Sequence, residues 1–212
     1  MYALAAGPLP SRIRVAGRSL RVFTVGPIAV IAGAPHGETS STEEALRAQH
    51  ALVVALAERV DPLLPARFGS RTTGSGLDAL VRPSVSALLE ALDHVRGRRQ
   101  MTVRLIGPVA AEQPRTATTT GTAYLMERRA AAHAVPAEAA PLRRAVDRFV
   151  IDERMHPGRG DIRATLFHLV ARGDVVSYRA AAEDRDTEAA MKPWRAAITG
   201  PWPPFAFAPE LA

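Results

Sequence analysis

The chain of 212 residues contains no cysteine. This absence excludes disulfides, thiolate nucleophiles and zinc sites with cysteine ligands, and it suits a reducing compartment. Long hydrophobic runs are missing too. The least polar stretch, residues 22–35, is only 14 residues long, which is too short to cross a bilayer. No basic region precedes an apolar run near Met1. We therefore expect a cytoplasmic protein with no signal peptide and no membrane partner.

Lysine is almost absent, since Lys192 is the only one among 27 basic residues and the others are arginines. The net charge of +6 and the isoelectric point near 10.8 permit an anionic partner. The arginines, however, are scattered along the chain. The densest group, Arg96, Arg98 and Arg99, ends a predicted helix, and the dipole of a helix favours cations at its C-terminus. We therefore interpret the arginines as solvated surface charge and do not expect nucleic acid as a partner.

Signatures of catalysis and of cofactor or metal binding are missing as well. No two of the six histidines lie four apart on a predicted helix, so the His-Glu-x-x-His metal site is excluded. Neither a Gly-x-Ser-x-Gly elbow nor a Gly-x-Gly-x-x-Gly fingerprint occurs. The glycine-rich stretch 69–76 lacks the lysine of a phosphate loop, because Leu77 follows it. We predict that the protein is not an enzyme, with no catalytic, cofactor-binding or metal-binding residues and no cofactor.

The first half of the chain predicts a small α+β domain. Its first 35 residues contain short β-branched runs separated by glycine and proline turns. Ser41 followed by Glu44 is a capping box that opens a helix with one largely apolar face. A strand is expected at residues 63–68, and a second helix, interrupted at Pro83, ends at Gly97. A boundary near residues 97–100 then defines an N-terminal domain, residues 1–98.

The second half, residues 99–212, predicts another α+β domain. Residues 161–171 are apolar on both faces, which is typical of a central strand. The succession of elements is β-α-β-α-β, which we interpret as ferredoxin-like. The predicted elements are a strand at 100–106, a disordered loop at 107–120, a bent helical region at 121–153, the strand at 161–171, a helix capped by Asp174 and a strand at 194–199.

The C-terminal strap, residues 198–207, concentrates proline and aromatic residues in a chain with only 5% aromatics. Proline fixes φ and removes a backbone donor, so residues 201–204 form neither helix nor central strand and we expect them to be extended and stiff. Two interpretations stay open. The rings pack on the protein's own core, or the strap is an arm that binds a partner. Its rings belong to Trp202, Phe205 and Phe207.

Three stretches resemble the gas vesicle protein L/F (GvpL/GvpF) family. Residues 199–205 read Thr-Gly-Pro-Trp-Pro-Pro-Phe, which is similar to the C-terminus of that family. Residues 50–56, followed by Leu-Leu-Pro-Ala-Arg-Phe-Gly at 63–69, are similar to its helix and following strand. Residues 121–125, Gly-Thr-Ala-Tyr-Leu, are similar to one of its helix starts. The three occur in the order of the family, and the resemblance extends over most of the chain, more loosely before Ser41.

The resemblance implies an accessory protein of gas vesicle assembly. Such a protein binds or chaperones the hydrophobic shell protein and supports nucleation of the shell, with the shell protein and other gas vesicle accessory proteins as partners. On this interpretation the candidate partner-binding residues are Arg67, Trp202, Phe205 and Phe207.

Arg67 and the family pattern each leave an alternative open. In a strand, Arg67 lies opposite to Phe68, and it either forms a salt bridge at the domain junction or contacts the shell protein. Met101 stands where the family has an aromatic residue, and the middle helical insert is short. The alternative function is therefore a repurposed small-molecule or nucleic-acid binding module without a gas vesicle role.

Overall fold

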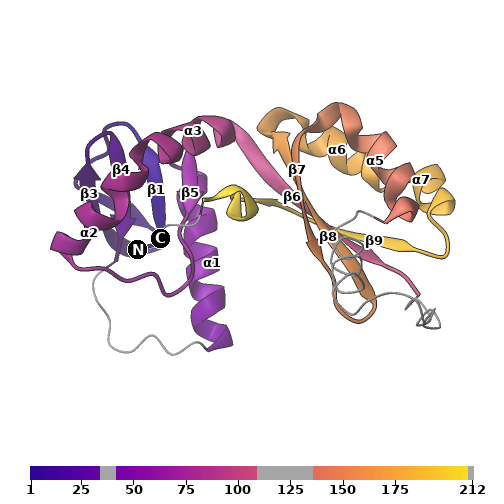
Figure 1. The fold of residues 1–212 in the computed structure, drawn as a ribbon, viewed down its shortest axis with the longest axis horizontal. Helices are drawn as coiled ribbons and strands as arrows, with labels where there is room; N and C mark the ends of the chain where they lie inside the picture. Colours follow the sequence, from indigo (N-terminus) through magenta and orange to yellow (C-terminus); the bar gives the residue numbers. More distant parts are fainter. Residues whose placement is uncertain (34–41, 109–135, 210–212) are drawn as a thin grey trace, which may run out of the picture. The chain divides into compact units, whose positions relative to one another are not determined.

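The computed structural model describes residues 1–33, 42–108 and 136–209, and it contains two compact units (Figure 1). The first comprises Met1–Arg99 together with Trp202–Ala212, and the second is the continuous segment Gln100–Pro201. Each unit combines one β-sheet with helices, which confirms the predicted α+β class. Among the described residues, none of the helices is both long and apolar enough to cross a membrane.

The first unit is built on a five-stranded sheet with the order β2-β3-β4-β1-β5, in which neighbouring strands pair antiparallel. Three helices accompany the sheet. The elements are β1 (Ala3–Ala6), β2 (Arg12–Val15), β3 (Arg18–Val25), β4 (Ile28–Ala32), α1 (Glu43–Ala57), β5 (Leu63–Pro65), α2 (Gly74–Val81) and α3 (Val85–Val95).

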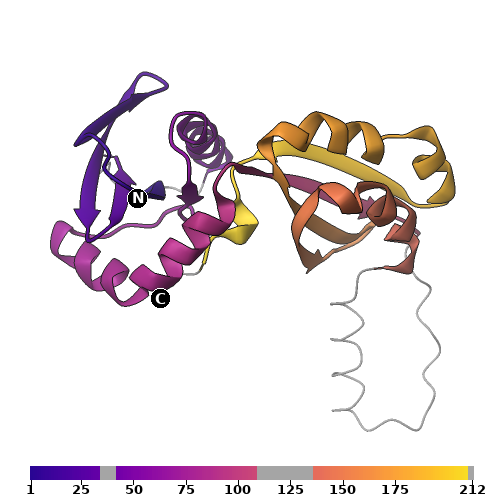
Figure 2. The same cartoon turned by 90° about the horizontal axis from the view of Figure 1, so that it is seen from above.

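Both faces of this sheet are covered. Figure 2 shows α1 and the α2–α3 pair on opposite sides of the strands. Ile31 of β4 belongs to the buried cluster that includes Leu52 and Leu56 of α1. Successive strand residues point to opposite faces, so Val30 faces the other way, and α3 contacts β1, β4 and β5 there. This explains why β4 is an unbroken apolar run.

Two predicted element boundaries of the first unit differ from the structure. Helix α1 is capped by Thr42, whose hydroxyl accepts a hydrogen bond of 3.2 Å from the Ala45 N–H, and the predicted cap Ser41 lies outside the described residues. The strand predicted to reach residue 68 ends at Pro65. The Ala66 N–H donates to the Tyr2 carbonyl, just outside β1, and β5 has no further strand residue of β1 to pair with beyond that point. Strand alternation therefore does not extend to residues 67 and 68.

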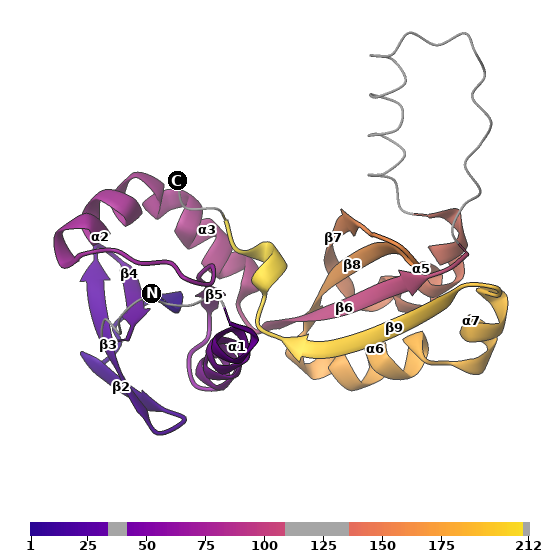
Figure 3. The same ribbon diagram turned by 90° about the horizontal axis from the view of Figure 1, so that it is seen from below.

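The second unit has a four-stranded sheet with the order β7-β8-β6-β9, and Figure 3 shows β9 beside β6. Helices α5, α6 and α7 lie on one face of this sheet (Figure 1). The elements are β6 (Arg98–Ile106), α5 (Ala140–Val146), β7 (Val150–Pro157), β8 (Ile162–Ala171), α6 (Val175–Ala182), α7 (Arg185–Ala190) and β9 (Arg195–Trp202).

The strand order bears on several predictions for this unit. Strand β8 is an interior strand, as its two apolar faces predicted. The helical region expected to run to residue 153 gives way to β7, because Val150 pairs with Val170 of β8. The loop predicted at 107–120 and the helix start at 121–125 fall largely or wholly in residues 109–135, outside the described part. The ferredoxin-like interpretation stays a prediction.

The division of the chain differs from the predicted domains 1–98 and 99–212 in one respect. The chain enters the second unit after Arg99, close to the predicted boundary, but Trp202 and the residues after it belong to the first unit. The sequence assigned them to the second domain because they follow its last strand. In the structure they contact residues of the first unit, chiefly on α1 and α3.

Candidate functional site

The strap begins as the end of an edge strand. Strand β9 continues through Pro201 to Trp202 at the edge of its sheet, where proline removes no ladder hydrogen bond that the sheet needs. A Cβ at Gly200 would lie 2.8 Å from the Gln100 carbonyl oxygen, so only glycine fits there. The Gly200 carbonyl in turn accepts a hydrogen bond of 2.6 Å from the Arg179 guanidinium. The Gly-Pro pair of the family motif thus has a local structural reason.

After Trp202 the strap folds into one turn of 3-10 helix, Phe205–Phe207. The Phe205 N–H donates to the Pro203 carbonyl at 2.7 Å, and the Phe207 N–H donates to the Pro204 carbonyl at 3.1 Å. The residues predicted to be extended, 201–204, are thus followed directly by a helical turn. Prolines fixed the backbone before the turn, and the turn directs the rings toward the first unit.

His50 of α1 holds two of the rings. Its ring centroid lies 5.1 Å from that of Trp202 in an edge-on arrangement and 5.3 Å from that of Phe205 in a stacked one. Phe205 also packs against the buried cluster beneath α1. Figure 3 shows the strap turn beside α1 and α3. No local sequence pattern indicates these partners of His50, because they lie about 150 residues away along the chain.

Phe207 is the most buried of the three aromatic residues. It is only 2% exposed, and its ring lies 6.5 Å from that of His94 in α3. Trp202 and Phe205 are half-buried. The sequence left open whether any of these rings packs internally. The turn points Phe207 inward, although it is the last of the three along the chain.

An exposed apolar residue continues the ring cluster along α1. Leu46 is 44% exposed. It precedes His50 by one helical turn, and residues four apart share a face of a helix. We name Leu46, His50, Trp202 and Phe205 the α1–strap surface.

Arg67 is exposed in the connection between β5 and α2. Strand β5, which ends two residues earlier, contacts the turn Phe205–Phe207. All four predicted partner-binding residues therefore belong to the first unit.

A second candidate site is a buried polar cluster in the second unit. His168 of β8 bonds through Nδ1 to the Tyr178 hydroxyl of α6 at 2.7 Å and through Nε2 to the Glu153 carboxylate of β7 at 2.9 Å. Arg143 of α5 donates to the same carboxylate at 3.2 Å and 3.0 Å. Four elements of the second unit are thereby connected. Sequence patterns do not indicate this cluster, because its bonded members are 10 or more residues apart.

The electrostatics of this cluster follow from its burial. The hydrogen bond from His168 holds the pKa of Glu153 below its ordinary value of 4.5. Burial, together with the nearby Glu153 charge, raises the pKa of Tyr178. Glu153 and His168 line a pocket of about 280 Å³. The other lining residues are Arg143, Val146, Asp147, Val150, Ile151 and Asp152.

The cluster is arranged to hold elements together. His168 and Tyr178 are both fully buried. Every buried side-chain polar atom of the described residues has a hydrogen-bond partner, which is the condition for a buried polar network to be stabilising. In the same part of the chain, no group of three or more histidine, aspartate or glutamate residues could hold a metal ion. The α1–strap surface is therefore the candidate site for a partner.

Comparisons with known proteins return one family and one fold. A family model described as gas vesicle synthesis protein GvpL/GvpF matches residues 1–209. The crystal structure of GvpF from Microcystis aeruginosa is similar with a TM-score of 0.72 and 14% identity, over 99% of this chain and 98% of that one. GvpF from Anabaena sp. PCC7120 is similar with a TM-score of 0.71 and 13% identity, over 100% of this chain and 95% of that one. None of the curated proteins matches.

Proposed function

This chain belongs to the GvpL/GvpF family of gas vesicle synthesis proteins, as its motifs indicated, and on that premise we propose that it is a non-enzymatic accessory protein of gas vesicle assembly. In this role it binds the hydrophobic shell protein, keeps it from aggregating and supports nucleation of the shell. It acts in the cytoplasm and at the gas vesicle, together with other accessory proteins. The match of the family model over residues 1–209 is the observation that carries this proposal.

The physical need for such a protein is direct. A small subunit with a large apolar face aggregates unless that face is covered. Aromatic and aliphatic residues near the centre of an interface supply most of its binding energy, and a polar rim surrounds them. The α1–strap surface supports the proposal, because exposed Leu46 and half-buried Trp202 and Phe205 are of the first kind. Arg67 is our candidate for the rim.

The two interpretations of the strap are compatible on this proposal. Phe207 anchors the turn inside the first unit, while Trp202 and Phe205 keep part of their surface accessible. An anchored, proline-stiffened segment loses little conformational entropy when a partner binds. The strap then serves as an internal strap and as part of the binding surface.

Co-expression with the shell protein tests the proposal. We expect Leu46→Gln combined with Trp202→Ala to lower the fraction of shell protein that stays in solution by several-fold. The matched control is Val176→Gln, which removes an apolar residue that is 80% exposed in the second unit. Equal effects of the two variants would contradict the α1–strap surface as the binding site. Aggregation of the shell protein whether or not the unmodified chain is present would favour the repurposed binding module.

A further inference from the structure

Positive charge is concentrated at the start of the first unit. Residues 1–33 contain four arginines and no aspartate or glutamate, and the first acidic residue in the chain is Glu38. All four arginines lie on the hairpin formed by β2 and β3, and all are exposed. We call this segment, Arg12, Arg14, Arg18 and Arg21, the arginine hairpin.

Two of these arginines face each other at the shortest distance that a sheet offers. Arg12 pairs with Arg21 in the antiparallel register. The Val22 N–H donates to the Ser11 carbonyl at 2.9 Å, so Arg12 and Arg21 form a pair without hydrogen bonds between them. The Cα atoms of such a pair are about 4.5 Å apart, and the side chains are close together. Like charges directly opposite destabilise a sheet, so an anion placed between them relieves a repulsion.

Other exposed arginines of this unit carry their own counter-charge. Arg82 pairs with Asp78 at 2.6 Å, Arg96 pairs with Asp93 at 3.2 Å, and Arg47 pairs with Glu43. Within residues 1–33, 42–108 and 136–209, by contrast, the structure records no carboxylate paired with an arginine of the hairpin. The Arg21 guanidinium instead lies 4.8 Å from the centroid of the Phe23 ring. Among the described residues, the positive charge of the hairpin therefore has no paired carboxylate.

The edge of strand β2 is partly occupied. β2 is an edge strand, and the Arg59 guanidinium donates to the Arg14 carbonyl at 2.8 Å. This contact blocks one of the backbone acceptors that an added strand would need. A partner therefore binds through the arginine side chains rather than by extending the sheet.

We propose that the arginine hairpin is a docking surface for an acidic protein segment that contributes carboxylates two residues apart. Guanidinium groups bind carboxylates through two parallel hydrogen bonds. Arg12 and Arg14 lie on one face, about 7 Å apart along the strand, which is the spacing of alternate residues in an extended segment. The proposal does not depend on the role in gas vesicle assembly.

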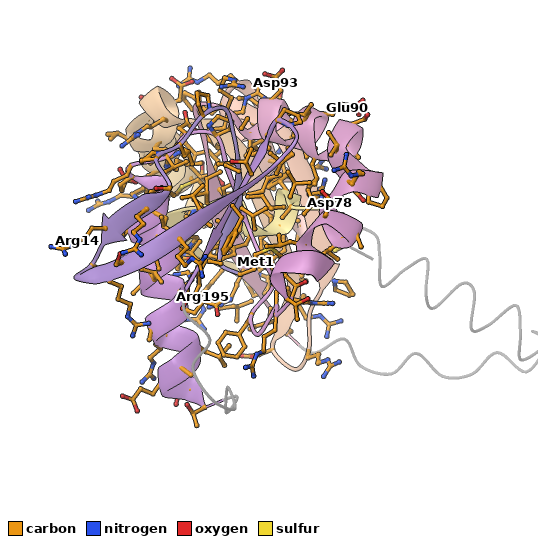
Figure 4. All side chains as sticks on the ribbon, turned by 90° about the vertical axis from the view of Figure 1, so that its left-hand side faces the viewer. Met1, Arg14, Asp78, Glu90, Asp93 and Arg195 are labelled. Atoms are coloured by element: carbon orange, nitrogen blue, oxygen red, sulfur yellow. The ribbon has the colours of Figure 1, made fainter. Side chains whose placement is uncertain are left out.

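A protein segment fits this surface better than a nucleic acid does. Single-stranded nucleic acids bind to grooves with aromatic rings on which their bases stack, whereas Arg21 lies over the Phe23 ring. Figure 4 shows Arg14 at the tip of the hairpin, with Asp78, Glu90 and Asp93 on the opposite side of the first unit. A short acidic segment contacts the hairpin alone, whereas a long polyanion would have to extend beyond these four arginines.

Fluorescence anisotropy with a labelled peptide of alternating glutamates tests the proposal in the full chain. We expect Arg12→Gln combined with Arg21→Gln to weaken binding about tenfold, because charge-assisted hydrogen bonds are lost. The matched control, Arg47→Gln combined with Arg82→Gln, makes the same change in net charge and should alter binding less than twofold. The hairpin variant should melt at the same or a higher temperature, because a repulsion is removed.

Four outcomes would overturn the proposal. An equal loss in both double variants would show that only net charge matters. A peptide with glutamine at every glutamate position that binds as tightly would show that carboxylates are not recognised. Tighter binding of a single-stranded oligonucleotide with the same charge as the peptide would assign the hairpin to nucleic acid. Aggregation of the hairpin variant with unchanged peptide binding would reduce the arginines to protection of a sheet edge, which also contradicts the proposal.

Discussion

Glu153 is the residue on which the polar cluster of the second unit depends. Its carboxylate accepts hydrogen bonds from His168 and from Arg143. Replacing it with glutamine removes the charge and leaves at least one donor without a partner. We expect Glu153→Gln to lower the free energy of unfolding by about 1–3 kcal/mol at neutral pH. Urea denaturation measures this loss, and Glu138→Gln, at an exposed glutamate of the same unit, is the control.

The same carboxylate makes a defined contribution to acid sensitivity. Its pKa in the folded protein lies below 4.5, chiefly because His168 hydrogen-bonds to the charged form. The unfolded chain therefore takes up this proton at a higher pH than the folded chain. The stabilising contribution of Glu153 is fully present above pH 4.5, the pKa in the unfolded chain. It is lost as the pH falls through the folded pKa. The stability difference between the unmodified chain and Glu153→Gln should shrink from about pH 5 to about pH 3. Parallel pH profiles would argue against this assignment.

Substitution of Arg67 distinguishes a structural role of this side chain from a role in binding. Because Arg67 is exposed, we expect Arg67→Ala to change the free energy of unfolding by no more than about 1 kcal/mol. On the proposed function it should also weaken binding of the shell protein. Thermal unfolding and pull-down of the shell protein measure the two effects, with Arg71→Ala, in the same connection, as the control. A loss of stability with unchanged binding would remove Arg67 from the binding surface.

Among the elements, the turn Phe205–Phe207 decides how firmly the strap is held. Phe207 is almost fully buried and Phe205 only partly. Replacing a buried phenylalanine with alanine lowers stability by about 3–5 kcal/mol, so Phe207→Ala should lower the melting temperature well below that of Phe205→Ala. Calorimetry measures both. Equal shifts, or no shift for Phe207→Ala, would contradict an anchoring role for this ring.

Element by element, sequence patterns succeeded where a local rule governs the structure. The two apolar faces of residues 161–171 correctly predicted an interior strand, because burial on both sides follows from composition alone. Patterns failed where a distant partner decides. Strand β5 ends where its pairing with β1 ends. The strap turns where its rings pack against His50 of α1 and His94 of α3. The cluster around His168 was equally invisible, since no spacing rule links a histidine to a tyrosine and a glutamate on other elements.

At the scale of the whole molecule, the first unit is assembled from two separate segments of the chain. The second unit is a continuous insertion between Arg99 and Trp202. We expect a fragment of residues 98–202, which includes all of β6 and β9, to fold by itself. A fragment of residues 1–99 should bind dyes for exposed apolar surface until a peptide of residues 202–212 is added. Circular dichroism and dye fluorescence measure this. Cooperative unfolding of residues 1–99, unaffected by the peptide, would contradict the assignment of the strap to the first unit.

This arrangement has a consequence during synthesis on the ribosome. Residues 1–99 emerge first, yet Phe207, which packs against them, emerges only after the inserted unit of about 100 residues has been made. At translation rates of about 5–20 residues per second, that delay is of the order of 5–20 seconds. For this interval the nascent first unit keeps the surface beneath the strap open. A protein proposed to cover the apolar surface of another protein is therefore synthesised with an apolar surface of its own uncovered. The time needed to translate the inserted unit sets how long that surface stays uncovered.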